Sequence, residues 1–313
     1  MTSHTMPQVC FVFGALRSGT TMFRLMLNNH PQISNPGEVD FLFDFLHPTP
    51  SADWRYDKTG LRANRIFMDT GLSLPHDLDG LPLLHHMINS LRGGADRVLT
   101  LNVHRNAARI AAALPEAKFI HLLRDGRDVA YSSIGMGWVG NAYFGVDHWL
   151  RTEAGWREAA SNIAPERTHT LAFESLMQDI EPRLRAVCTF LEVPFDAQML
   201  AYHENSSYGP PDPRIAQQWK RKADPHMIAL IEGKAAATLR DLGYDVAGQP
   251  RYPGAVERVR LSAENRVRRW QFNLRRFGPM LFFKTAVAKV SGSPTLRARV
   301  QKQRNDRIAR LLK

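Results

Sequence analysis

The residues with the clearest chemistry lie near the start of the chain, in the stretch FVFGALRSGTT at positions 11–21. The apolar run at 9–13 has the character of a strand, a Gly- and Ser-rich turn follows it, and helical spacing begins near Thr20. Free N–H groups and the positive dipole end at such a helix start attract anions. The spacing matches the nucleotide-binding pattern GxxxxGK[ST], except that Thr20 replaces the lysine. Because the cation of this loop is Arg17 instead, the pattern favours a phosphate ligand other than a nucleoside triphosphate.

A second strand-to-helix junction carries polar residues in the stretch KFIHLLRDGRDVAYSS at 118–133. Arg124 follows its apolar run, and Ser132 lies eight residues later in the next helix. As an alternative to binding an anion, Arg124 can pair with the aspartates of RDGRD. Glu38 and His104 lie near the ends of other apolar segments. A carboxylate or an imidazole can act as a general base near neutral pH.

Alternating strand and helix signals position these residues. Strands are expected at 9–13, 97–103, 119–123 and 168–173, and helices after Thr20, at 81–92, at 106–114, after Arg127 and at 182–191. This order predicts an α/β fold with a P-loop-type central parallel sheet and helices on both faces. Ligands of such sheets bind beyond the carboxyl ends of the strands, where the polar candidates would meet. Residues 48–80 show weak periodicity, and we expect long loops there.

The ordered motifs from about residue 8 to residue 245 resemble those of the sulfotransferases that use 3′-phosphoadenosine 5′-phosphosulfate (PAPS), including glycan and protein-tyrosine sulfotransferases. RSGTT at 17–21 is similar to the family's 5′-phosphosulfate loop, and HP at 30–31 followed by GE at 37–38 is similar to its next segment. PEAKFIHLLRDGRD at 115–128 is similar to the 3′-phosphate site. Later stretches of the family's catalytic domain are matched by FESLM at 173–177, LRAVCTFLEVPFD at 184–196 and LRDLGYD at 239–245.

The resemblance implies an enzyme that moves a sulfuryl group from PAPS to a hydroxyl acceptor such as a glycan, glycolipid or lipid-like molecule, without a metal ion. The chemistry agrees, because this transfer needs cations on the leaving phosphate and a base for the acceptor hydroxyl. Phe173 replaces a tyrosine common in the family, and either packs near adenine or belongs to the core. The implied cofactor-binding residues are Arg17, Ser18, Gly19, Thr20 and Thr21 for the 5′-phosphosulfate, Arg124 and Ser132 for the 3′-phosphate, and Phe173.

The general base has two candidates. Glu38 begins EVDFLF, which resembles the E-V-H-F-F stretch of glycan sulfotransferases, whose glutamate takes the acceptor proton. In protein-tyrosine sulfotransferases the base would align at Val39, which cannot serve. His104 lies in LNVHR, which resembles the L-K-T-H-L segment of small-molecule sulfotransferases, where the histidine is the base. We prefer Glu38 and keep His104 as the alternative.

One departure from the family concerns the cation that assists the leaving oxygen. Asn102 stands where the small-molecule sulfotransferases have a lysine. Arg17 is therefore the expected catalytic cation, with Arg105 as the alternative.

The net charge of +11 is unevenly distributed along the chain. Residues 251–313 hold 17 Lys and Arg against 3 Asp and Glu, a net +14, whereas residues 1–250 hold 24 against 27, a net −3. We therefore predict a PAPS-dependent sulfotransferase domain at 1–250 and a basic amphipathic helical tail at 251–313. A last helix is expected from Ser293-Pro294. The first tail helix should end at Gly278-Pro279 and carries an apolar stripe formed by Val256, Val259, Ala263, Val267, Trp270, Leu274 and Phe277.

Three partners could cover this apolar stripe. An aromatic and aliphatic face beside arginines fits an interfacial helix on an anionic membrane surface. The catalytic domain itself, or a second copy in a homodimer, would cover it equally well. An anionic acceptor is a further alternative partner of the basic tail. Nucleic acid is disfavoured because no recognition motif accompanies the charge.

The remaining composition points to a cytoplasmic protein. Cys10 and Cys188 give neither a disulfide framework nor a metal-ligand spacing, which indicates buried thiols in a reducing compartment. About eight residues precede the first strand, too few for a signal peptide. We expect peripheral association at the inner face of the membrane if the tail binds lipid.

Two functions of other classes stay open at this point. A P-loop NTPase or kinase with a degenerate Walker A loop is weakened by Thr20 and by the lack of a clear magnesium-binding aspartate after an apolar strand. A non-catalytic binding protein that works through its basic tail would keep the same fold without needing Glu38 or His104 as a base.

Overall fold

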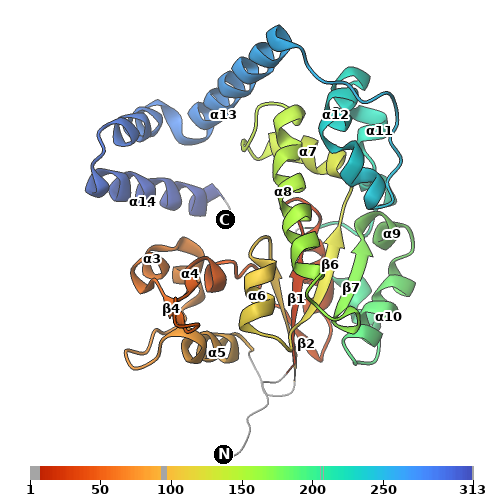
Figure 1. Cartoon of the computed structure of the whole chain (residues 1–313), viewed down its shortest axis with the longest axis vertical. Helices are drawn as coiled ribbons and strands as arrows, with labels where there is room; N and C mark the ends of the chain where they lie inside the picture. Colours follow the sequence, from red (N-terminus) through yellow and green to blue (C-terminus); the bar gives the residue numbers. More distant parts are fainter. Residues whose placement is uncertain (1–7, 93–96, 205, 207, 312–313) are drawn as a thin grey trace, which may run out of the picture.

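A five-stranded parallel sheet, in the order β2-β5-β1-β6-β7, forms the centre of the computed structural model (Figure 1). The structure describes residues 8–92, 97–204, 206 and 208–311. Two short antiparallel strands lie apart from the sheet, β3 (Leu46–Pro48) and β4 (Trp54–Tyr56). The strands of the central sheet are β1 (Val9–Phe13), β2 (Ile33–Ser34), β5 (Val98–Val103), β6 (Lys118–Leu123) and β7 (Thr168–Ala172).

Helices cover both faces of this sheet and continue into a C-terminal extension (Figure 1). Those of the body are α1 (Thr20–Asn28), α2 (Phe41–Asp44), α3 (Lys58–Ala63), α4 (Arg65–Thr70), α5 (Gly80–Leu91), α6 (Ala107–Ala113), α7 (Gly126–Gly135), α8 (Ala142–Ala160), α9 (Phe173–Gln178), α10 (Ile180–Phe190), α11 (Trp219–Lys222) and α12 (Pro225–Asp241). Short 3₁₀ turns lie at Pro165–Arg167, Ala197–Ala201 and Pro213–Ile215. The extension consists of α13 (Ala255–Val290) and α14 (Pro294–Leu311).

The two sides of β1 show how the core is divided. Phe11 and Phe13 face a cluster that includes α5, α6 and Trp156 of α8, whereas Cys10 and Val12 face a second cluster that includes α1 and α10. Every residue of β1 is buried, as expected for a central parallel strand covered on both faces. The α/β fold with helices on both faces, and the helical C-terminal extension, are therefore confirmed.

The predicted strands agree with the structure to within one residue at each end. The strand expected at 168–173 ends at Ala172, because Phe173 begins α9. Both cysteines are buried and free, as predicted. Residues 1–7, on which the absence of a signal peptide was judged, lie outside the described residues.

The expectation of long loops at 48–80 is wrong in part. Asp57 and Asn64 accept hydrogen bonds from backbone N–H groups of the turn that follows each, and so begin α3 and α4. Each helix has six residues and buries one apolar side chain, Leu61 or Phe67. Helices this short contain too few turns to produce a recognisable periodicity in the sequence.

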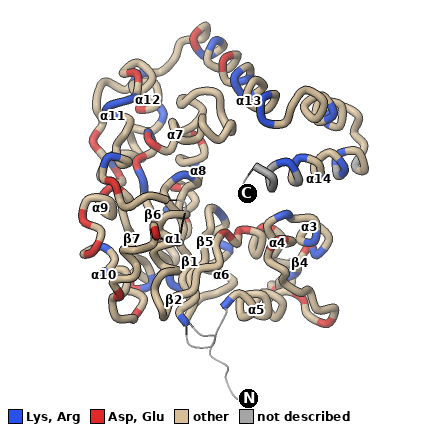
Figure 2. The backbone as a smooth tube through the Cα atoms, turned by 180° about the vertical axis from the view of Figure 1, so that it is seen from behind, with Lys and Arg blue, Asp and Glu red and all other residues tan. Residues whose placement is uncertain are grey.

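The tail forms two helices that fold back on each other. Within α13 the helix is interrupted at Gly278, where φ is 75° and ψ is 162°, beside Pro279. The predicted end of the first tail helix is therefore a break, after which the chain resumes helical geometry to Val290. Basic residues recur along both helices (Figure 2). Within the part of the chain that the structure describes, no helix combines the length and the apolar character that crossing a membrane requires.

Candidate functional site

The loop between β1 and α1 has a backbone shape that depends on glycine. Gly19 precedes α1 with a φ of 91°, in the left-handed region, and, because it has no side chain, it cannot cap the helix. A Cβ atom at Gly19 would lie 2.3 Å from the ring of Phe173. Since the first N–H groups of a helix have no acceptor within the helix, this start of α1 is free to bind an anion. Thr20 and Thr21 belong to its first turn and line the adjoining cavity.

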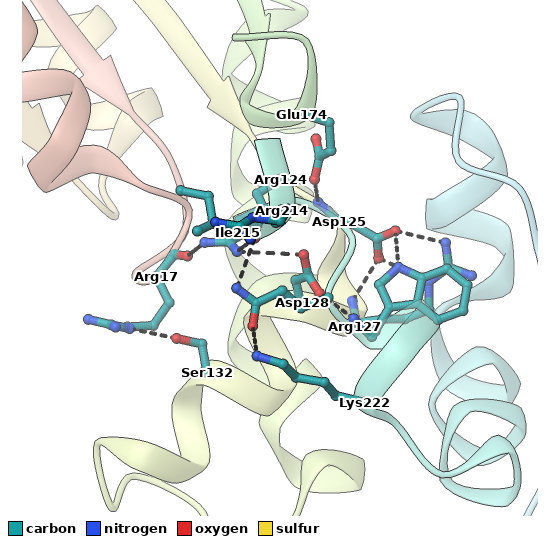
Figure 3. Close-up of polar contacts among 12 residues, drawn as sticks. Arg17, Arg124, Asp125, Arg127, Asp128, Ser132, Glu174, Arg214, Ile215 and Lys222 are labelled. Atoms are coloured by element: carbon teal, nitrogen blue, oxygen red, sulfur yellow. Dashed lines mark hydrogen bonds and ion pairs between the residues drawn. The ribbon is translucent and has the colours of Figure 1, made fainter. Parts of the chain in front are cut away.

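Three of the predicted cofactor residues are joined by hydrogen bonds (Figure 3). Arg17 donates from Nε to the Ser132 hydroxyl at 2.9 Å, and its carbonyl accepts from Nη1 of Arg124 at 3.0 Å. Arg124 also donates from Nη2 to the carbonyl of Ile215 at 2.9 Å. The first loop, the β6–α7 junction and the segment before α11 thus meet at one place. Both arginines and Ser132 line the same cavity.

Two buried polar atoms beside this loop have no hydrogen-bond partner among the described residues. They are Oγ of Ser18, a fully buried residue, and Nε of Arg124. A buried polar atom without a hydrogen-bond partner costs free energy. The Ser18 hydroxyl and the Arg124 Nε–H can each donate a hydrogen bond. An anionic phosphate oxygen accepts hydrogen bonds from both kinds of group. Ser18 is fully buried and does not line the cavity, so it is not placed to touch a ligand there. The predicted residues that do line the cavity fit the phosphate groups of a nucleotide donor, namely Arg17, Gly19, Thr20, Thr21, Arg124 and Ser132.

Phe173 packs against the loop between β1 and α1. Its ring is 1% exposed, lies against Gly19 and carries the Arg124 guanidinium 4.4 Å from its centroid. Of the two sequence interpretations, core packing accounts for its burial. The edge that reaches the cavity is small, so its main effect is to fix the positions of Gly19 and Arg124.

The second arginine of RDGRD has a structural role. Arg127 is buried between Asp125, at 2.8 Å, and Glu232 of α12, at 2.6 Å. Its guanidinium lies 3.7 Å from the ring centroid of Trp219, whose indole N–H donates to Asp125. These contacts tie α7 to α11 and α12. By contrast, the ion pair that Arg124 makes within RDGRD is long, with Nη2 3.5 Å from Oδ2 of Asp128. The aspartates of the motif therefore do not neutralise Arg124 as closely as they neutralise Arg127.

The two candidate bases lie next to each other. His104 Nε2 is 3.5 Å from Oε1 of Glu38, longer than a typical hydrogen bond. The Glu38 side chain is 42% exposed and lines the cavity, whereas the His104 side chain is 3% exposed and lies behind it. On its other side, His104 uses Nδ1 to donate to the Gly14 carbonyl at 2.7 Å. Only Glu38 of this pair is placed to touch a ligand in the cavity.

The pair favours an ionised carboxylate and a protonated imidazole. The neighbouring His104 side chain lowers the pKa of Glu38, against the opposing effect of partial burial. Burial disfavours a charge on His104, but Glu38, Asp40 and the Gly14 carbonyl outweigh it and raise the pKa of His104. Because Nδ1 already donates to Gly14, the proton that faces Glu38 is the one on Nε2.

The pH dependence follows from this pair. Glu38 must be ionised to accept a proton, so activity falls as the pH drops through the pKa of Glu38. His104→Asn removes the neighbouring positive charge, so the pKa of Glu38 rises and the acid limb of the kcat/KM profile should move up by about one pH unit. Steady-state rates of the wild type and of His104→Asn from pH 4 to pH 9 measure this shift of the acid limb. An unmoved acid limb would show that His104 does not set the pKa of Glu38, and loss of turnover at every pH would show that His104 has a further role in the reaction.

Asn102 positions Glu38. Its backbone N–H donates to the Gly37 carbonyl at 3.0 Å, and its own carbonyl accepts from the Val39 N–H at 2.9 Å. Its side chain donates to the carbonyl of Thr20 at 3.2 Å. Asn102 thus links the segment that carries Glu38 to the start of α1. The loop between β1 and α1, residues 14–19, is called the phosphate loop below.

Arg105, the alternative cation, is engaged away from the loop. It binds Asp44 through two hydrogen bonds and lies 3.6 Å from Asp40. Arg17 therefore stays the candidate that acts on the leaving oxygen.

The cavity also contains residues that the sequence reasoning missed. It has a volume of about 1600 Å³ and is bounded by the phosphate loop, α4, α7, the α11 region and the tail. Arg65 of α4, Trp138 and Tyr208 line it, and each comes from a segment without a recognisable motif. Lys222 of α11 lines it as well and donates to the Gln218 side chain at 2.9 Å.

The fold and the site define a class of protein. A parallel sheet with a glycine-containing loop at the carboxyl end of β1, beside a cavity lined by arginines and a carboxylate, is typical of α/β proteins that bind a phosphate-bearing ligand at that edge of the sheet. The family follows from comparison with known proteins. Residues 9–197, more than half of the chain, match the model of the sulfotransferase family, and the chain belongs to that family.

Individual relatives agree with this assignment. A Caenorhabditis briggsae protein assigned as a protein-tyrosine sulfotransferase is 28% identical over 206 residues, which are 63% of this chain and 70% of the relative. Protein-tyrosine sulfotransferase A of Caenorhabditis elegans is 23% identical and is matched over 62% of this chain, but over only 52% of its own length. The sulfotransferase domain from the curacin biosynthetic pathway has a similar fold, with a TM-score of 0.58 and 19% identity over 77% of this chain and 99% of that domain.

Proposed function

We propose that this sulfotransferase moves a sulfuryl group from PAPS to a hydroxyl of a glycan, glycolipid or lipid-like acceptor. The observation that carries the proposal is the convergence of the phosphate loop, Arg17, Arg124 with Ser132, and Glu38 on one cavity. When bound, PAPS supplies an activated sulfuryl group on a phosphate that can leave.

Each of these groups has a distinct part in the transfer. The N–H groups at the start of α1 and the hydroxyls of Thr20 and Thr21 bind the 5′-phosphosulfate. Arg17 stabilises the negative charge that develops on the leaving phosphate. Glu38 removes the proton from the acceptor hydroxyl as its oxygen bonds to sulfur. Arg124 and Ser132 bind the 3′-phosphate, a group that ATP lacks.

Transfer of labelled sulfate tests this function. The full chain is incubated with [³⁵S]PAPS and separate glycan and lipid extracts, and the products are resolved chromatographically. We expect label in an acceptor fraction with the wild-type chain and at most about one hundredth of its rate of labelling with Glu38→Gln. Absence of transfer to both extracts, or equal transfer by the variant, would contradict the proposal.

We also propose that the exposed apolar stripe of α13 rests on an anionic membrane surface. The tail docks on the body through other residues and leaves five members of the stripe 41–85% exposed, namely Val256, Val259, Val267, Trp270 and Leu274. The net charge of +14 in this region complements anionic lipid.

Vesicle sedimentation tests the membrane proposal. Val259→Glu with Val267→Glu should weaken binding to phosphatidylglycerol vesicles about tenfold or more. The substitutions remove apolar contact with the lipid and introduce carboxylates that the anionic surface repels. Phosphatidylcholine vesicles are the control. Equal pelleting with both lipids, or an unchanged double variant, would contradict it. A dimer that the double variant dissociates would instead assign the stripe to a second copy of the chain.

A further inference from the structure

The tail is fixed to the body at the connection between α7 and α8. The N–H of Gly140 donates to Oδ1 of Asn265 in α13 at 2.6 Å. At Gly137, where φ is 70°, a Cβ atom would lie 2.0 Å from the ring of Phe272. The close approach of α13 therefore depends on these glycines, since any side chain at Gly137 would displace the helix.

The docked tail forms a wall of the cavity that holds the catalytic candidates. α13 runs past the body and α14 turns back beside it (Figure 1). At about 1600 Å³, the cavity exceeds the 300–1,000 Å³ range of pockets for one small ligand, which leaves space for an acceptor beside the nucleotide. The residues that α13 and α14 contribute to the cavity include Arg266, Arg269, Trp270, Arg276, Phe277, Phe282, Lys289 and Arg304.

The charge of the cavity exceeds what a nucleotide donor would neutralise at the loop. Its described acidic lining residues are Glu38 and Asp128. Its basic lining residues are Arg17, Arg65, Arg124, Lys222, Arg266, Arg269, Arg276, Lys289 and Arg304. Five of these nine come from the tail, so an anion besides the nucleotide would be favoured beside it.

Two tail arginines have unsatisfied donors in this wall. Nε of Arg276 and Nε of Arg304 are buried and have no hydrogen-bond partner among the residues that the structure describes. Arg304 lies 4.7 Å from the ring centroid of Phe277, and burial lowers the pKa of Arg304. Glu257 and Glu264, the described acidic residues of α13, are paired elsewhere. A guanidinium whose buried Nε–H has no acceptor gains from an anionic ligand.

We propose that the tail wall selects a hydroxyl acceptor that already carries an anionic group next to an apolar chain. Arg276 and Arg304 bind the anionic group, and Phe277 and Phe282 contact the apolar part. This inference rests on the proposed function, because Glu38 must face the acceptor in the same cavity. The tail is then part of the acceptor site as well as a membrane contact.

Matched probes separate the charge from the apolar chain. Octyl glucuronide and octyl glucoside share the ring hydroxyls and the alkyl chain and differ at C6, where a carboxylate replaces the hydroxymethyl group. Calorimetry on the full chain saturated with adenosine 3′,5′-bisphosphate, with both probes below their micelle concentrations, should show about tenfold or more tighter binding of the glucuronide. Glucuronic acid without the chain should bind more weakly than octyl glucuronide, because it makes no contact with the aromatic residues.

Arginines on the same helices provide a matched control. Arg276→Gln with Arg304→Gln should abolish the preference for the glucuronide, whereas Arg275→Gln with Arg307→Gln removes the same charge from exposed positions and should preserve it. Equal binding of the two octyl probes, or a preference that survives the first pair of substitutions, would overturn the inference. Failure of adenosine 3′,5′-bisphosphate to bind would contradict the proposed function instead, so the two failures are distinguishable.

Discussion

Replacing Glu38 by glutamine is expected to lower kcat by roughly 10²- to 10⁴-fold, the usual contribution of a positioned general base. Glutamine keeps the size and hydrogen-bonding reach of the side chain but cannot accept a proton. Glu38 lines the cavity and lies 3.5 Å from His104, which keeps it ionised through its lowered pKa. Single-turnover rates with [³⁵S]PAPS measure the chemical step directly.

The nucleotide affinity of the same variant is the control. Among the described residues Glu38 makes no hydrogen bond with Arg17 or Arg124. Adenosine 3′,5′-bisphosphate should therefore bind Glu38→Gln as it binds the wild type. Full turnover by Glu38→Gln, together with inactivity of His104→Asn, would assign the base to His104.

Arg17→Ala should have an effect of similar size by another route. The guanidinium is the cation of the phosphate loop, and removing a preorganised donor from a developing negative charge costs about 10²- to 10³-fold in kcat. Affinity for the nucleotide should also fall, since a charge-assisted hydrogen bond contributes about 1.5–3 kcal/mol. Steady-state kinetics give the first effect and calorimetry the second.

Arg17→Lys is the matched variant for this residue. Lysine keeps the charge but loses the Nε donor that binds Ser132 at 2.9 Å, so only part of the activity should return. Thermal unfolding serves as the stability control, because Arg17 has a positive φ of 78° and its replacement alters the loop. Wild-type turnover by Arg17→Ala would remove Arg17 from the catalytic account.

The sequence predicted the parts of the site that depend on local patterns. The phosphate loop follows from its glycine spacing, and the parallel sheet follows from alternating strand and helix signals. The placement of Glu38 beside His104 was not predictable from spacing, because it depends on Asn102 joining two segments about 65 residues apart. The residues that flank Glu38 and His104 in the sequence give no sign that these two side chains lie next to each other.

For the tail, the sequence pattern predicted the helix but not the face that contacts the body. Its helix and charge were predicted, but the prediction treated the apolar stripe as the face that would be covered. In the structure the body contacts Asn265 and Phe272, and every member of the stripe except the buried Phe277 stays exposed. The contact depends on the close approach permitted by Gly137 and Gly140, which no periodicity reveals.

The nucleotide specificity of the full chain tests the central claim most directly. Calorimetry with adenosine 3′,5′-bisphosphate and with ATP and Mg²⁺ compares a ligand that has a 3′-phosphate with one that has a triphosphate instead. We predict that the bisphosphate binds at least tenfold more tightly and that Arg124→Ala removes most of this preference. Tighter binding of ATP with Mg²⁺ would contradict the assignment of this cavity to PAPS.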